Sequence, residues 1–261
     1  RQNGVPFALV NARISEKSTR AYKLVRPLFT RLLGQAAFAA LQTPEDARRY
    51  ESLGLNSAKI TVCGNVKYDT LNDTPCRVDE VKKLVSALGW EKSPVLVCGS
   101  THPLEEEILL AAAPQLIKKG LKIIFAPRHL ERRQEIEQNL KNSRLNYAMM
   151  SQKAVPCDIL CADVMGFLQS LYTCAALTFV GGSIAPRGAH NLLEPAILGK
   201  AVLFGQSFFN TPDTARALLT QGGGTLVNPA NFKSTVLRLL EDEPLRRDMN
   251  AKARKTALSF K

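Results

Sequence analysis

One stretch of the sequence decides the fold and locates the candidate site: residues 177–195, LTFVGGSIAPRGAHNLLEP. The apolar run 177–180 predicts a buried strand, and two glycines follow it at once. A polar loop containing Arg187 and His190 then leads into a helix, which we expect to begin near Asn191. Glycines let backbone N–H groups approach an anion, and the N-terminus of a helix adds partial positive charge. We therefore expect the ligand of this protein to be an anion that binds at this turn.

Outward from this stretch, strands and helices alternate over residues 93–261. Short apolar runs predict the strands, which we expect at 95–98, 122–126, 158–160, 177–180, 201–204 and 225–227, with a weaker one near Ala148. This alternation predicts an α/β fold with a parallel sheet covered by helices on both faces. Ligands of such sheets bind at the carboxyl ends of the strands, so the loops that follow the strands form the candidate site.

Residues 1–70 form a separate part of the chain. We expect strands at 5–10, 36–41 and 60–63, an amphipathic helix over 18–33, and a second helix from Thr43-Pro44 to Gly54. Three strands are few for an independent doubly wound sheet. We therefore interpret residues 1–70 as the C-terminal part of an N-terminal domain whose first part is not in this chain. The polar residues 71–92 predict a linker with a connecting helix, and residues 93–261 a second domain.

All three histidines of the chain follow an expected strand: His102 in GSTH, His129 in PRH and His190 in the opening stretch. The strand exits of a parallel sheet converge on one cleft, so we expect the three imidazoles to lie together. Guanidinium groups, hydroxyls and glycine amides beside them suit a phosphate or carboxylate ligand. The residues that we expect at this ligand site are Ser100, Thr101, His102, Arg128, His129, Met165, Gly166, Gly181, Gly182, Ser183, Arg187, His190, Asn191 and Glu194.

Glu194 has two interpretations. The spacing Asn191-x-x-Glu194 is typical of a capping box, in which the glutamate only completes the start of a helix. Pro195 lies in the same first turn, however, and allows a different helix start. With Glu194 in that first turn, its carboxylate can accept hydrogen bonds from the two hydroxyls of a ribose. We favour the ribose interpretation, and the capping role stays open at this point.

Three common nucleotide-binding patterns are missing from the sequence. No GxGxxG follows the strand 95–98, which excludes a dehydrogenase-type dinucleotide site, and no GxxxxGK[ST] is present, which argues against a P-loop ATPase. There is also no pair of aspartates after a strand that could hold a metal on a diphosphate. We therefore predict a nucleotide site that uses no metal and no cofactor.

The net charge of +12 is concentrated near the start of the chain. Residues 1–35 hold seven Lys and Arg residues against Glu16 alone. A basic helix favours an anionic partner, such as lipid headgroups, nucleic acid or a phosphorylated substrate, although a solvated face is an equal alternative. Apolar residues recur between these charges at helical spacing, and they belong either to a core or to a face on a membrane surface. Aromatic residues are few and do not alternate with the basic ones, which argues against a nucleic-acid-binding module.

Five motifs together resemble one family, and they cover essentially the whole chain in order. They are NARISEKS (residues 11–18), GNVKYD (64–69), GSTH (99–102), PRH (127–129) and GGSIAPRGAHNLLEP (181–195). This set resembles the transferases of 3-deoxy-D-manno-octulosonic acid (Kdo) in lipopolysaccharide biosynthesis. Val66 departs from the pattern, where methionine or another large apolar residue is expected, and the change is conservative.

The resemblance implies a GT-B glycosyltransferase with two Rossmann-like domains. Such an enzyme moves Kdo from CMP-Kdo onto a lipid A precursor (lipid IVA) with inversion of configuration and without a metal. It acts at the cytoplasmic face of the inner membrane of Gram-negative bacteria, in outer membrane biogenesis. The resemblance also implies an N-terminal membrane anchor and an acidic catalytic base in a glycine-rich loop, and neither is visible here. We therefore expect this chain to bind CMP without catalysing transfer.

The resemblance further implies individual roles. Arg128 and the backbone near Met165-Gly166 are expected to face cytosine and phosphate, Glu194 to bind ribose, and Gly182, Ser183 and Asn191 to bind the phosphate. On the acceptor side, the residues expected to contact the Kdo carboxylate or acceptor phosphates are Arg13, Ser15, Glu16 and Lys17. The alternative function is a sugar-nucleotide epimerase of the same architecture, which would prefer a uridine nucleotide.

Overall fold

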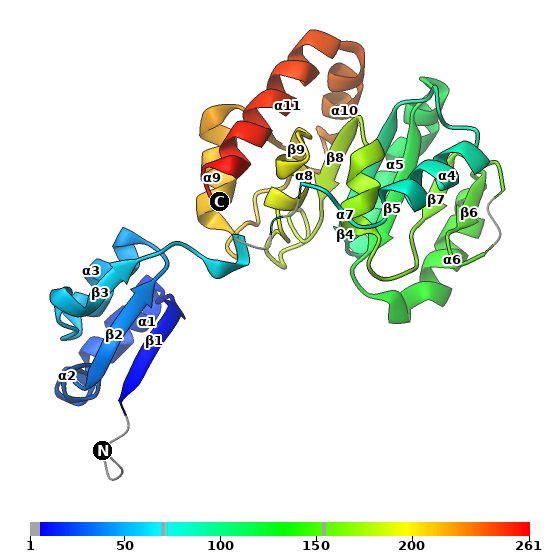
Figure 1. Ribbon diagram of the computed structural model, residues 1–261. Helices are drawn as coiled ribbons and strands as arrows, with labels where there is room; N and C mark the ends of the chain where they lie inside the picture. Colours follow the sequence, from blue (N-terminus) through cyan, green and yellow to red (C-terminus); the bar gives the residue numbers. More distant parts are fainter. Residues whose placement is uncertain (1–5, 69–70, 72, 153–154) are drawn as a thin grey trace. The chain divides into compact units, whose positions relative to one another are not determined.

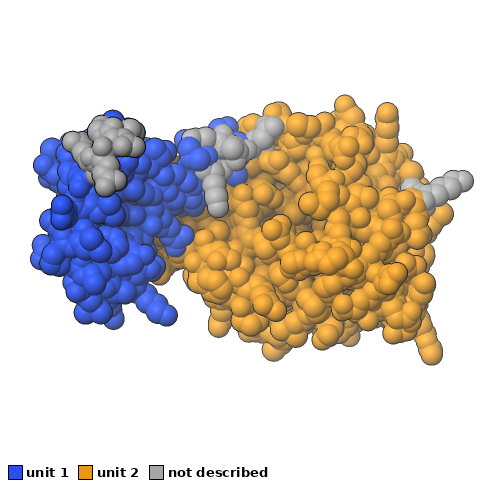
Figure 2. Space-filling model, turned by 90° about the horizontal axis from the view of Figure 1, so that it is seen from below, with its two compact units in different colours: residues 1–71, 260–261 blue, residues 72–259 orange. Residues whose placement is uncertain are grey.

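The computed structural model describes residues 6–68, 71, 73–152 and 155–261, and the chain forms two compact units (Figure 1). Unit 1 comprises residues 1–71 and 260–261, and unit 2 comprises residues 72–259; Figure 2 colours them separately. Two positions used in the sequence analysis lie outside the described residues: Val5, at the start of an expected strand, and Asp69, at the end of the GNVKYD motif.

Unit 1 is a three-stranded parallel sheet in the order β1-β2-β3, as three strands were expected. Its described elements are β1 (Phe7–Ala12), α1 (Glu16–Lys23), α2 (Arg26–Leu33), β2 (Ala36–Leu41), α3 (Pro44–Ser52) and β3 (Ile60–Val62). The fully buried residues of its core are Ile14, Leu33, Ala36, Ala39, Leu41, Leu53 and Leu55. The start of α3 is as predicted, because the side chain of Thr43 caps it and Pro44 opens it.

The single helix expected over residues 18–33 is wrong, since this segment contains the end of α1 and the whole of α2. Pro27 lies in the first turn of α2. A proline has no N–H to donate to the carbonyl four residues earlier, here that of Lys23, and its ring clashes with that carbonyl. The first helix therefore ends at Lys23, and the second begins at Arg26.

The apolar stripe of these two helices divides between core and solvent. Leu33 is buried, and Phe29 packs against the core of unit 1. By contrast, Leu24, Leu28 and Leu32 are 86%, 66% and 51% exposed. Leu28 and Leu32 are four residues apart in α2 and so share a helix face, and Leu24 lies between α1 and α2. The stripe is therefore core in one part and an exposed apolar face in the other.

Unit 2 is a seven-stranded sheet in the order β10-β9-β8-β4-β5-β7-β6, with every described pairing parallel. In chain order, its strands and α-helices as far as α7 are α4 (Val78–Ala87), β4 (Val95–Thr101), α5 (Pro103–Lys118), β5 (Lys122–Pro127), α6 (Arg133–Ser143), β6 (Tyr147–Met149), β7 (Ile159–Cys161) and α7 (Leu168–Leu171). The remaining elements are β8 (Leu177–Val180), α8 (Leu193–Ile197), β9 (Val202–Phe204), α9 (Pro212–Gln221), β10 (Gly224–Leu226), α10 (Phe232–Glu241) and α11 (Glu243–Leu258).

Both faces of this sheet are buried, as the continuous apolar runs predicted. Along β4, Leu96 and Cys98 join the core cluster that contains α5 and α10, whereas Val95 and Val97 join the cluster that contains α4 and α7. Successive side chains of a strand point to opposite faces, so each face of β4 has its own core. The α/β fold with a parallel, doubly covered sheet is confirmed.

The helix expected in the connecting segment 71–92 is α4, and it packs on unit 2. Val81 and Trp90 are each 1% exposed, and the indole N–H of Trp90 donates to the carbonyl of Cys157 at 2.8 Å. The segment is therefore part of the core of unit 2. Its polar composition concealed the few apolar residues that anchor it.

The strand order of unit 2 reverses direction at β4, whose neighbours are β5 on one side and β8 on the other. Ligands of such sheets bind where the order reverses, at the carboxyl ends of the strands. Gly99, near the end of β4, and Gly181, directly after β8, are joined by a hydrogen bond from the Gly181 N–H to the Gly99 carbonyl at 2.8 Å. The two most conspicuous motifs of the sequence, GSTH and GGS, therefore lie side by side.

Candidate functional site

A cavity of about 400 Å³ lies at this point of unit 2. Its lining residues are Ser100, Arg128, Gly166, Leu168, Gln169, Tyr172, Val180, His190, Asn191 and Glu194. Six of them were expected from the sequence, and they come from the ends of four different strands or from the segments that follow them. Its size is within the range of pockets that bind small molecules.

The backbone has an irregular conformation and is tightly packed where β4 ends. Ser100 has a φ of 55°, in the left-handed region, and the pairing of β4 with β5 is irregular between Gly99 and Thr101. A side chain at Gly181 would place its Cβ 2.2 Å from the Ser100 carbonyl oxygen. Glycine is therefore required at 181, because any other residue would push the two strand exits apart. Such strained conformations gather at binding sites.

The three histidines lie together, as their positions after the strands predicted. The ring of His102 is 5.5 Å from that of His129 and 5.5 Å from that of His190, with which it is stacked. The Nε2 atoms of His102 and His190 are 3.2 Å apart. Two neutral imidazoles can form this hydrogen bond only if one ring donates its Nε2 proton and the other accepts it.

Arginines surround this cluster and act on its protonation. Burial, together with repulsion from Arg128, His102 and His129, lowers the pKa of His190 to about 4. Burial also lowers the pKa of His102, with added repulsion from His129 and Arg187. The imidazoles of His102 and His190 are therefore neutral near pH 7, beside guanidinium groups that carry the positive charge. An anion bound here would meet cations and polarised N–H donors together.

The contacts of Glu194 differ from those of a capping box. The helix α8 begins at Leu193, whose N–H donates to the Asn191 side-chain oxygen at 3.1 Å. The amide nitrogen of Asn191 donates to Oε1 of Glu194 at 3.2 Å. Glu194 thus bonds to a side chain and not to the backbone of the cap, and its carboxylate lines the cavity. Burial raises its pKa, partly opposed by Asn191 and Arg128.

The glycine turn after β8 is arranged differently from the expected phosphate site. Its backbone N–H groups at Gly182 and Ser183 donate to the carboxylate of Glu105, at 2.9 and 3.0 Å. The hydroxyl of Ser183 donates to the Val180 carbonyl at 2.6 Å. The turn is an anion site, as its glycines indicated, but a carboxylate of the protein itself occupies it. The three acidic residues at the start of α5, Glu105 to Glu107, were the available signal in the sequence.

The other expected residues lie around the cavity or beyond it. Thr101 is buried and donates to Glu106 at 3.2 Å. Arg187 and His129 are exposed. Met165 and Gly166 line a second cavity of about 440 Å³, with Pro75, Cys76, Arg77, Gln169 and Ser170. Gly166 and Gln169 belong to both cavities.

The cavity also has lining residues that the sequence analysis missed, in the segment 167–175. Leu168, Gln169 and Tyr172 all line the cavity. The phenol of Tyr172 reaches the sheet because Gly99 has no side chain; a Cβ there would lie 1.9 Å from the Tyr172 oxygen. This pairing of a glycine in a strand with a tyrosine 73 residues later leaves no signal in the local sequence.

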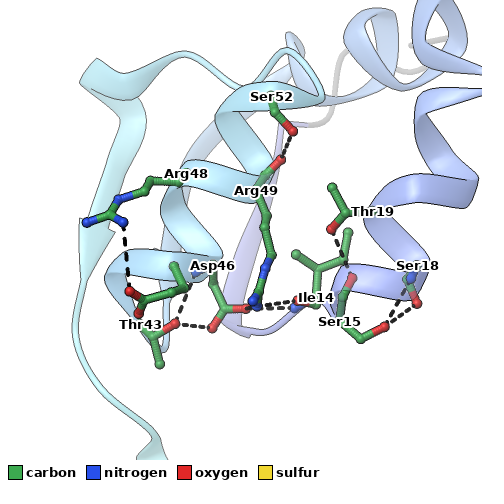
Figure 3. Close-up of polar contacts among 10 residues, drawn as sticks. Ile14, Ser15, Ser18, Thr19, Thr43, Asp46, Arg48, Arg49 and Ser52 are labelled. Carbon is green, nitrogen blue, oxygen red and sulfur yellow. Dashed lines mark hydrogen bonds and ion pairs between the residues drawn. The ribbon is translucent and has the colours of Figure 1, made fainter.

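The four expected acceptor-side residues lie in unit 1, in the first turn of α1 and just before it; Figure 3 shows Ser15, which caps this helix. Ser15 caps α1 by accepting the Ser18 N–H at 3.0 Å, and Glu16 pairs with Arg20. Arg13 and Lys17 are exposed. The residue before Ser15, Ile14, is held by hydrogen bonds at both its N–H and its carbonyl.

The hydrogen bonds to Ile14 come from two side chains of α3 and are drawn in Figure 3. The buried Asp46 accepts the Ile14 N–H at 3.0 Å, and Arg49 donates to the Ile14 carbonyl at 3.1 Å. Asp46 also accepts the Thr43 hydroxyl at 2.7 Å. These contacts fix the loop that carries Arg13 and Ser15 to the helix that follows β2.

Among the described residues, no group of three or more His, Cys, Asp or Glu side chains could hold a metal ion. The same residues contain no helix whose length and apolar character would let it cross a membrane. The use of no metal stays a prediction.

The parallel sheet with a polar cavity at its switch point defines a Rossmann-like α/β fold of the GT-B class. Solved structures of this class resemble the chain: the UDP-GlcNAc 2-epimerase from Neisseria meningitidis bound to UDP-GlcNAc superposes with a TM-score of 0.59 over 99% of this chain and 70% of that one. Its sequence identity is 15%, so this likeness shows the fold alone.

Sequence relatives are more specific. Residues 1–70 match the family described as 3-deoxy-D-manno-octulosonic-acid transferase (kdotransferase). The Kdo transferase of Chlamydophila psittaci is 31% identical over 91% of this chain and 55% of its own length. That of Haemophilus influenzae is 32% identical over 86% of this chain and 53% of its own length.

A solved structure agrees with these relatives. The C-terminal CMP-Kdo binding domain of WaaA from Acinetobacter baumannii superposes with a TM-score of 0.64 and 28% identity, over 69% of this chain and 96% of that domain. The chain belongs to the Kdo transferase family of glycosyltransferases. It spans about half the length of the curated relatives it matches.

Proposed function

We propose that unit 2 binds CMP-Kdo, and that the whole protein transfers Kdo to a lipid A precursor, lipid IVA, with inversion of configuration, in lipopolysaccharide biosynthesis. The observation that carries this proposal is the cavity at the β4–β8 switch point, which gathers Arg128 from the PRH motif and His190 and Glu194 from the motif 181–195. The similarity to a CMP-Kdo binding domain supports the choice of nucleotide.

In this proposal each group of the cavity acts on a different part of the donor. The buried carboxylate of Glu194 accepts hydrogen bonds from the ribose hydroxyls, and Arg128 faces the negatively charged phosphate. His190 donates a hydrogen bond to that phosphate through its ring. Donors fixed around a leaving phosphate stabilise the charge that develops on it, and a metal is not needed for this. No residue of this chain is proposed as the base that activates the acceptor hydroxyl.

Unit 1 is proposed to face the acceptor and an anionic membrane surface, at the cytoplasmic face of the inner membrane. Its exposed leucines Leu24, Leu28 and Leu32 lie among basic side chains, and both Lys23 and Arg26 are exposed. An apolar face bordered by cations is typical of elements that rest on anionic lipid headgroups. Arg13 and Lys17 remain the proposed contacts for acceptor phosphates or the Kdo carboxylate.

Titration of CMP into the purified chain and its variants tests the site. We expect Arg128→Ala and Glu194→Ala each to weaken CMP binding by about tenfold or more, because each removes a charge-assisted contact. The matched control is Arg247→Ala, which removes an exposed arginine that pairs with Glu243 on α11. Undiminished CMP binding in both cavity variants would overturn the site assignment.

A further inference from the structure

Glu105 makes more hydrogen bonds to the backbone than the role of a charge at a helix start requires. It lies in the first turn of α5, and its side chain is almost entirely buried, with 2% exposed. Its Oε2 accepts the N–H groups of His102 at 3.1 Å and Gly182 at 2.9 Å. Its Oε1 accepts those of three successive residues, which are Ser183 at 3.0 Å, Ile184 at 2.9 Å and Ala185 at 3.2 Å.

Successive backbone N–H groups that point to one place form a concave anion site, or nest. Here the nest consists of the amides of residues 182–185, and the carboxylate of Glu105 occupies it. Hydrogen bonds to an ionised acceptor are stronger than those between neutral groups. The close approach requires a glycine at 181, where a Cβ would lie 2.8 Å from Oε2 of Glu105.

The nest is connected directly to the cavity. The N–H of His190 donates to the carbonyl of Gly181 at 3.1 Å, one residue before the nest. A Cβ at Gly182 would lie 3.1 Å from Cδ2 of His190, so the ring rests against the turn. His102, whose N–H also bonds to Glu105, stacks on the ring of His190. The carboxylate of Glu105 therefore fixes the turn that supports His190, and it also holds the backbone of His102, whose ring stacks on that of His190.

We propose that Glu105 is a positioning residue of the nucleotide site: its carboxylate occupies the nest in place of a ligand phosphate and thereby holds His190 at the cavity. The phosphate of the ligand is then bound by side chains of the cavity and not by the amides of residues 182–185. This inference rests on the proposed function, because it states how that same site binds its phosphate.

The charge and the two equivalent oxygens of glutamate are both needed. A glutamine has the same size, but its Nε2 group donates, and every backbone group that faces either oxygen of Glu105 is itself a donor. Glu105→Gln therefore places donor against donor whichever way the amide is turned. Glu107, on the same helix turn, is exposed and provides the matched control, Glu107→Gln.

Hydrogen exchange of the unaltered chain gives the first test and needs no variant. We expect the amides of residues 182–185 to be protected from exchange in the absence of nucleotide and to stay equally protected when CMP is added. Amides that exchange freely without CMP and become protected only with it would mean that the nest receives the ligand phosphate. That result overturns the proposal.

Variants give the second test, with CMP affinity as the readout. Glu105→Gln is expected to bind CMP on the order of tenfold more weakly or worse, while Glu107→Gln binds it as the unaltered chain does. Glu105→Ala removes a CH₂–COO⁻ group, so added acetate is expected to restore part of its CMP affinity, whereas chloride at equal ionic strength is not. Glu105→Gln binding within about twofold of the unaltered chain contradicts the proposal, as does a folded Glu105→Ala whose weakened binding acetate leaves unchanged.

The proposed function of unit 2 and the positioning role of Glu105 can be disproved separately. If the unaltered chain does not bind CMP at all, the proposed function is wrong, and the exchange of the nest amides still shows whether Glu105 occupies the nest. If the unaltered chain binds CMP and the Glu105 variants bind it equally well, only the positioning role is wrong.

Discussion

His102 and His190 show how the chemistry of this site depends on the surroundings of single residues. Free histidine titrates near neutral pH, but these two rings are partly buried, stacked, and faced by arginines from the loops after β5 and β8. Burial and repulsion both favour the neutral ring, so the pKa of each is lowered. Neutral rings can donate to an anion without adding to the repulsion among the nearby guanidinium groups.

The lowered pKa of His190 predicts a loss of stability in acid. Its pKa falls from an ordinary 6.5 to about 4 in the folded chain, so the unfolded chain takes up a proton first as the pH falls. The stabilisation is therefore complete above about pH 6.5 and is lost progressively toward pH 4. We expect His190→Asn to show a smaller drop in unfolding temperature between pH 7.5 and pH 5 than the unaltered chain.

Gln134→Asn is the control for this measurement, because Gln134 is exposed on α6 and does not titrate, so its replacement should leave the acid drop unchanged. The lowered pKa of His102 contributes in the same direction, so part of the drop remains in His190→Asn. Glu194 acts in the opposite direction, since its raised pKa removes stability as the pH rises above its ordinary 4.5. An acid drop in His190→Asn equal to that of the unaltered chain contradicts the assignment.

At the scale of elements, the sequence predicted most strands and long helices, and it failed where a contact joins distant segments. The run 177–180 is β8, and the expected strand 122–126 lies in β5, because continuous apolar runs are local signals. Glu105 and its nest are separated by 77 to 80 residues, so no local pattern links them. The expected helix over 18–33 ignored Pro27, which was a local signal and could have been used.

The candidate site was predictable to a similar degree. Convergence of the histidines followed from their places after strands, which topology alone decides. The roles of Leu168 and Tyr172 did not, because an apolar helix that lines a cavity has the same pattern as one that fills a core. The same limit hid the role of α4, whose anchor is one buried tryptophan.

Trp90, which follows α4 in the chain, leads to a prediction about the stability of unit 2. Trp90→Ala removes a fully buried ring and its hydrogen bond to Cys157, and it should lower the free energy of unfolding of unit 2 by about 3–5 kcal/mol. Thermal or denaturant unfolding followed by circular dichroism measures this, since the variant has no tryptophan. Lys92→Ala, at an exposed neighbouring position, is the control. A loss below about 1 kcal/mol would show that α4 is not part of the core.

At the scale of the whole molecule, the charge of +12 and the exposed leucines of α2 belong to the proposed membrane surface. The chain is expected to bind vesicles that contain anionic lipid and to bind neutral ones weakly, with binding that falls as salt is added. Lys23→Glu combined with Arg26→Glu should weaken binding to anionic vesicles by more than about tenfold.

The matched control reverses two charges on unit 2, with Arg247→Glu and Lys255→Glu on the exposed surface of α11. Sedimentation with vesicles measures both variants. Equal losses in the two double variants would indicate a non-specific effect of net charge, and the α1–α2 face would then have no special part in binding.

The central claim is that unit 2 is a site for a cytidine nucleotide, and a calorimetric titration of the intact chain with CMP and with UMP tests it most directly. The account predicts that CMP binds at least about tenfold more tightly than UMP, because loss of even one base-specific hydrogen bond weakens binding by about that factor. Binding of UMP as tight as or tighter than that of CMP would contradict it and would favour the epimerase alternative.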